Sequence, residues 1–131
     1  MGISASGMKV QGERLRVIAE NIANADTTGT TPGSDPYRRK TITFKNVMDK
    51  ELGADVVETA EIGQDTDTAF RLKFMPDHPA ADENGYVKLP NVNTLVETMD
   101  MREAQRSYEA NLGMISIAKS MMNRTLDLLR G

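Results

Sequence analysis

Apolar residues near the start of the chain recur at the spacing of one helical face. Residues 3–25 contain no proline, and intervals of seven, three, four and three separate Met8, Leu15, Ile18, Ile22 and Ala25. A helix brings positions at these spacings onto one side. The pattern predicts a helix over 3–25, followed by a loop over 26–36 that is rich in Thr, Gly and Pro.

A longer helical pattern covers the end of the chain. Thr94 and Glu97 fit the S/T-x-x-E capping box of a helix start, and no proline follows them. One apolar stripe then runs over four heptads: Met101, Ala104, Tyr108, Leu112, Ile115, Ala118, Met122, Leu126 and Leu129. Further apolar residues lie off this stripe: Met114, Ile117, Met121 and Leu128.

The length of this second helix exceeds what one small domain can cover. A helix over 94–130 is about 55 Å long at 1.5 Å per residue. A compact domain of 131 residues has a diameter of roughly 36 Å. A helix of about 23 residues at the other end of the chain is too short to cover it. We therefore expect other subunits to cover the apolar surface near the C-terminal end.

The middle of the chain favours short strands. Alternating or β-branched segments occur at 41–44, at 56–57 with Ile62, and at 70–74. Residues 86–89 follow an Asn-Gly turn signal and are expected to close a small sheet or hairpin. The sequence thus predicts an α+β fold. Two long terminal helices (1–27 and 93–131) pair like a coiled coil, and a loop with a small β-rich domain (28–92) is inserted between them.

Composition narrows the chemistry that the chain can perform. It has no cysteine and one histidine, His78, and its formal net charge is −3, with a net −5 carried by residues 41–90. The chain lacks the basic surface of a nucleic-acid binder and an apolar run of the roughly 20 residues that a bilayer span needs. We expect no catalytic residues, metal or cofactor. The enzymatic alternative is a small metal-dependent hydrolase that uses His78 with Asp77 and Asp82.

Two asparagines close to the predicted end of the first helix allow two interpretations. Asn21 and Asn24 can hydrogen-bond the neighbouring backbone and so terminate the helix. Alternatively, Ala23 and Ala25 let another helix approach closely, while the asparagines fix its register by polar pairing, as a buried asparagine does in coiled coils. The spacing alone does not separate these alternatives.

The segment that contains these asparagines, A-E-N-I-A-N-A-D-T at 19–27, resembles the signature of flagellar axial proteins. Further stretches are similar to the basal-body rod proteins within that family: P-Y-R-R-K at 36–40, H-P-A-A-D at 78–82, G-Y-V at 85–87, P-N-V-N at 90–93 and D-M…R-S-Y-E-A-N at 100–111. One departure is T-G-T at 28–30, where many members have T-P-G-Y. It affects the expected loop geometry.

The resemblance implies a structural subunit of the proximal rod that polymerises and transmits torque. It also implies export by the flagellar type III apparatus without signal cleavage, a periplasmic place in the basal body, and contacts with itself, other rod subunits and a rod-base adaptor. Family export substrates carry a Phe-x-x-x-hydrophobic signal, which Phe44 and Met48 fit, although strand packing is the favoured role of Phe44. Alternatives are another rod subunit, a rod-base adaptor, or a soluble coiled-coil module that is not secreted.

The assembly contacts are expected on both helices. The candidate residues are the apolar and polar positions of the two helical stripes: Leu15, Ile18, Asn21, Ile22, Asn24, Met101, Tyr108, Asn111, Leu112, Ile115, Met122, Leu126 and Leu129. Helices that pack along their length resist shear collectively, because many small dispersion contacts act together.

Overall fold

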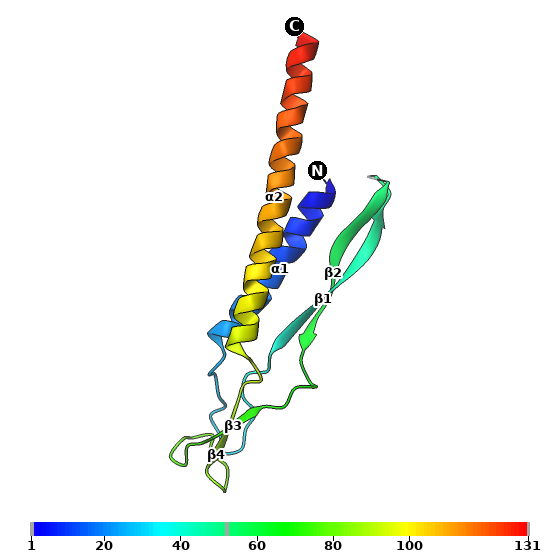
Figure 1. The fold of residues 1–131 in the computed structure, drawn as a ribbon. Coiled ribbons are helices and arrows are strands. Elements are labelled where there is room, and N and C mark those ends of the chain that lie inside the picture. Colours follow the sequence, from blue (N-terminus) through cyan, green and yellow to red (C-terminus); the bar gives the residue numbers. More distant parts are fainter. Residues whose placement is uncertain (1, 52, 131) are drawn as a thin grey trace.

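The computed structural model describes residues 2–51 and 53–130, and its two helices confirm the predicted α+β fold. Helix α1 spans Gly2–Ala23 and helix α2 spans Thr94–Arg130. The two helices pack side by side and run in opposite directions (Figure 1). Neither described helix combines the length and the apolar composition that a membrane span requires.

Small and polar residues set the register between the helices. The Ser4 hydroxyl lies 3.9 Å from the sulfur of Met114. A Cβ atom at Gly7 would lie 2.9 Å from the side-chain oxygen and nitrogen of Asn111, closer than real Cβ atoms come, so glycine allows this approach. Ala104 is fully buried. The helices therefore approach each other closely near the start of α1.

Among the described residues, the chain between the end of α1 and the start of α2 forms four strands, which make two separate antiparallel pairs. Strand β1 (Lys40–Asp49) pairs with β2 (Ala54–Gln64), and β3 (Arg71–Phe74) pairs with β4 (Tyr86–Leu89). The pairing of 86–89 with the segment before it confirms the predicted hairpin. Its connection spans 75–85, so the Asn84-Gly85 pair is the end of a longer loop and not a two-residue turn.

The strands of the first pair are longer than the sequence pattern indicates. They contain 10 and 11 residues, with a bulge at Ala60, where the partner of Thr43 is Glu61 and that of Phe44 is Thr59. The hairpin follows α1, and α2 packs on the other side of that helix (Figure 1). Contact with α1 supports a long ribbon in which few positions, such as Val56, need to be buried apolar residues.

The start of α2 is where predicted, but its cap is different. The side-chain oxygen of Asn93 accepts hydrogen bonds from the backbone N–H groups of Leu95 (3.1 Å) and Val96 (3.3 Å). Asn93 is thus the N-cap, and the predicted capping box of Thr94 and Glu97 is wrong. The Glu97 side chain does not fold back onto the helix start because it pairs with an arginine outside the helix.

Candidate assembly interface

Asn21 joins the end of α1 to the start of β1. Its amide nitrogen donates to the carbonyl oxygen of Lys40 at 2.9 Å, and its oxygen accepts from the Lys40 N–H at 2.8 Å. The same oxygen accepts the Tyr37 hydroxyl at 2.7 Å. The side chain is 1% exposed, so one amide pairs with the strand backbone as a neighbouring strand would. Neither interpretation of the sequence named this partner.

Asn24 behaves as the helix-terminator alternative describes. Its amide nitrogen donates to the Glu20 carbonyl oxygen at 2.9 Å, and its oxygen accepts the Thr27 hydroxyl at 3.0 Å. These local bonds end α1 at Ala23, two residues before the predicted end. The two asparagines of the motif therefore have different structural roles.

A charged cluster ties the loop before β1 to α2. The Arg39 guanidinium pairs with the carboxylate of Glu97, which is 1% exposed, and lies 3.7 Å from a carboxylate oxygen of Asp65. The Arg39 N–H donates to the side-chain oxygen of Asn91 at 2.7 Å, and the Asn91 amide donates to the carbonyls of Asp65 and Thr68 at 3.0 Å. Sequence patterns do not pair Arg39 with Glu97, because 58 positions separate them.

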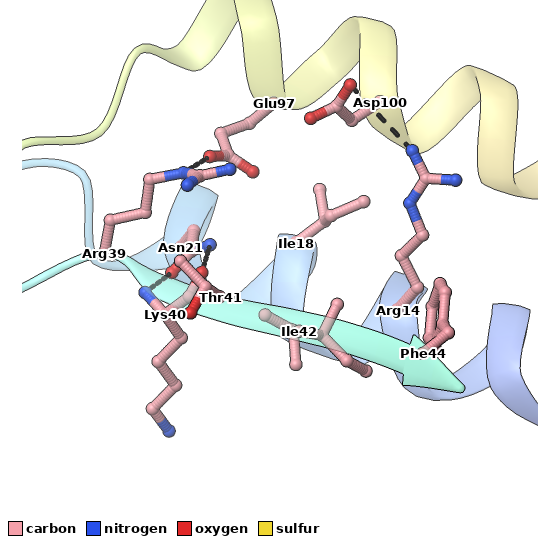
Figure 2. A pocket seen from close by; sticks show the side chains of 11 residues that line it. Arg14, Ile18, Asn21, Arg39, Lys40, Thr41, Ile42, Phe44, Glu97 and Asp100 are labelled. Carbon is pink, nitrogen blue, oxygen red and sulfur yellow. Dashed lines mark hydrogen bonds and ion pairs between the residues drawn. The ribbon is translucent and has the colours of Figure 1, made fainter. Parts of the chain in front are cut away.

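A groove of about 400 Å³ lies beside this cluster. Figure 2 shows Ile18 of α1, Ile42 of β1 and Glu97 of α2 around it. Glu97 uses one carboxylate oxygen for Arg39, and among the described residues the other oxygen has no hydrogen-bond partner. The groove thus combines a few apolar side chains with charged ones and with one buried acceptor that has no hydrogen-bond partner among the described residues.

The proton equilibria of this region follow its burial and pairing. Burial raises the pKa of the Tyr37 hydroxyl above its ordinary value. A hydrogen bond at 2.7 Å between Lys40 and Glu20 lowers the pKa of the Glu20 carboxyl and raises that of the Lys40 amine. Hydrogen bonds from Thr68, first from its backbone, lower the pKa of Asp65.

The candidate assembly residues fall into three groups. Ile18 and Asn21 are buried within the chain. The half-buried group, between the helices or at their margins, is Leu15, Ile22, Asn24, Met101, Tyr108, Asn111 and Ile115. The exposed group is Leu112, Met122, Leu126 and Leu129, each at least 49% exposed. The first two groups belong at least partly to the fold of the subunit, whereas the third is available to other molecules.

The end of α2 projects beyond the rest of the molecule (Figure 1). All residues from 119 to 130 are exposed, and 12 residues of helix extend about 18 Å. Their largest apolar side chains, Leu128 and Leu129, are 82% and 79% exposed. We call residues 119–130 the α2 tip. The tip continues a helix that is already nucleated, but no packing among the described residues stabilises it, and packing supplies most of the stability of helices in proteins.

The two sequence-predicted export residues lie on β1. Phe44 is 37% exposed and lines the groove with Ile18 and Ile42 (Figure 2). Met48 is 60% exposed near the end of the strand. The packing and export roles of Phe44 both stay predictions.

His78 has partners within its own loop region. Its Nδ1 accepts the Ala80 N–H at 3.0 Å, and its Nε2 lies 3.3 Å from the Thr28 hydroxyl. No cluster of three or more potential metal-ligating side chains occurs among residues 2–51 and 53–130. The bonds of His78 hold the 75–85 connection against the loop after α1.

Two known protein families match the parts of the chain that contain helices α1 and α2. Residues 1–30 match a family described as flagella basal body rod protein, and residues 83–128 match one described as flagellar basal body rod FlgEFG protein C-terminal. The chain is 51% identical, over 98% of its length and 91% of the relative, to the flagellar basal-body rod protein FlgC of Agrobacterium fabrum. The chain belongs to the FlgC family. It is a structural subunit of the flagellar basal-body rod.

More distant FlgC proteins align over nearly the whole chain as well. Identity is 38% to FlgC of Salmonella typhimurium, over 96% of this chain and 92% of that protein. It is also 38% to FlgC of Aquifex aeolicus, over 97% and 92%. The sequence similarity therefore extends through the segment between the helices and is not limited to the helices themselves. As a member of this family the subunit assembles with other rod components in the basal body.

Proposed function

We propose that this FlgC-family subunit polymerises through its terminal helices and so transmits torque along the rod. The exposed apolar tip of α2 carries the proposal. Because the partner helix α1 ends before it, the tip has to be buried against other subunits, and the ordering of the tip is then offset by apolar burial. In this scheme residues 1–27 and 93–131 make the axial part of the subunit, and residues 28–92 make the outer part.

Contacts between different surfaces suit such a polymer. The α2 tip of one subunit and the helix pair of another are unlike surfaces, and unlike surfaces give rings or continuing helical arrays. The candidate assembly residues Leu112, Met122, Leu126 and Leu129 lie on these exposed surfaces. We infer that Leu15, Ile22 and Ile115 contribute at their half-exposed edges.

The route to the rod is part of the same proposal. The chain is exported by the flagellar type III apparatus without signal cleavage and assembles in the periplasm with other rod subunits and a rod-base adaptor. Phe44 and Met48 act as the gate signal on the unfolded chain, where the strand packing of Phe44 does not exist. An unfolded chain without cysteine also has no thiol that an oxidising compartment could trap.

The test places charge on the exposed tip. A Met122→Asp, Leu126→Asp variant should be secreted but absent from purified basal bodies, and its cells should not swim. Both residues are about half exposed, so the substitutions should leave the fold intact. The isolated variant should therefore have the same circular dichroism spectrum as the unmodified subunit. Ser116→Asp, at an exposed position of α2 before the tip, is the matched control and should swim normally. Normal swimming by the double variant would contradict the proposal.

A further inference from the structure

A second groove lies between α1 and the β1–β2 hairpin. It has a volume of about 570 Å³, within the range of about 300–1,000 Å³ typical of ligand pockets. Val10 and Val56, both buried, give it an apolar floor. The groove is at the end of α1 near the N-terminus, where the hairpin runs beside that helix (Figure 1).

The rim of this groove is acidic. Four carboxylates line it, those of Glu13, Asp49, Glu51 and Glu58, against one amine, that of Lys9, which gives a formal charge of −3. Glu51 and Glu58 are exposed to solvent. An apolar floor with an acidic rim favours an occupant that is both apolar and basic.

The α2 tip has this complementary character. It carries Lys119, Arg124 and Arg130 against Asp127, a formal charge of +2. Its apolar side chains include Met121 and Leu128, which flank Arg124 at helical spacing and are 62% and 82% exposed. Arg124 thus shares one face of the helix with apolar side chains, and no hydrogen bond or ion pair holds it among the described residues.

We propose that the acidic groove of one subunit binds the α2 tip of a second copy of this chain. An amphipathic helix docking into a groove is a common mode of recognition. Within one chain α2 packs on the opposite side of α1 from the hairpin (Figure 1), so the occupant comes from another copy. Groove and tip are different surfaces, so the contact can continue from copy to copy. The inference rests on the proposed polymerisation and specifies one of its contacts.

Exchange of charge between the two surfaces tests the contact. Glu51→Lys with Glu58→Lys, or Arg124→Glu, should each lower incorporation into basal bodies by about tenfold or more, because like charges then face each other. Combining all three changes restores opposite charges and should recover incorporation and swimming. If the combined variant is no better than either parent, the proposed pairing is wrong.

Matched controls separate pairing from a general effect of charge. Arg106→Glu makes the same change on an exposed position of α2 outside the tip, and Glu83→Lys does so in the distal 75–85 connection. Both should incorporate normally. Normal incorporation of the groove and tip variants themselves would overturn the docking site. The polymerisation proposal is tested separately, by the Met122→Asp, Leu126→Asp variant.

Cross-linking identifies the occupant directly, since the chain has no cysteine of its own. Ser6→Cys in the groove and Ser120→Cys on the tip, co-expressed as separate subunits, should give an oxidised dimer in basal bodies. Ala69→Cys paired with Ser120→Cys should not. A groove cysteine that cross-links only to a rod protein of different mass would overturn the assignment to a second copy.

Discussion

Loss of the Asn21 side chain should detach the start of β1 from α1. Asn21→Ala removes three hydrogen bonds, two with the Lys40 backbone and one with the Tyr37 hydroxyl. A typical hydrogen bond contributes about 0.5–1.5 kcal/mol net, so the loss should be roughly 2–4 kcal/mol. Lys40 and Tyr37 are half-buried, and water that reaches them brings the value toward the lower end.

Two measurements on the isolated subunit check this estimate. Urea titration followed by circular dichroism gives the change in the free energy of unfolding. Hydrogen exchange reports the Lys40 amide, which should lose protection when its acceptor is removed. Both measurements address the part of the chain where α1 contacts β1, so they do not depend on whether the α2 tip is ordered.

Asn24→Ala is the matched control. It removes bonds to the Glu20 carbonyl and the Thr27 hydroxyl, at a less buried site where water replaces them. The expected cost is about 0.5–1 kcal/mol, with no change at the Lys40 amide. Equal losses for the two variants, or a Lys40 amide that stays protected in Asn21→Ala, would refute the assignment of Asn21 as the junction.

Two further predictions concern acidity and helix content. Hydrogen bonds from Thr68 lower the pKa of Asp65, so the stabilisation is present above the ordinary carboxyl pKa of about 4 and is lost as the pH falls through the lower folded value. Asp65→Asn should therefore flatten the acid dependence of unfolding in urea titrations at different pH, and an unchanged dependence would contradict this. The helices contain 22 and 37 residues. Circular dichroism of the isolated subunit should show up to about 12 fewer helical residues, those of the α2 tip, because these residues are exposed and lack the packing that stabilises the rest of α2. Full helicity at low concentration would contradict this.

Local spacing was enough to place the elements that depend on near neighbours in sequence. The apolar period predicted both helices within two residues of their ends, apart from the cap of α2, because the positions facing one side of a helix are set by residues three and four apart. The excess length of α2 also followed from the sequence, since it needs only the rise per residue. The motif at 19–27 carried the resemblance to the rod family that the comparisons confirm.

Partners far apart in sequence were decided only by the tertiary structure. The spacing of Asn21 left its role open, and the fold assigned it to Lys40, 19 positions away. Glu97 matched a local capping pattern, yet Arg39 binds it instead, because a buried carboxylate is stabilised more by a cation than by a helix-end N–H. The long hairpin and its acidic groove likewise depend on the surface of α1 beside them. A sequence pattern indicates which side chains of a segment face the interior. Which residues they contact there depends on the segments that the fold brings together.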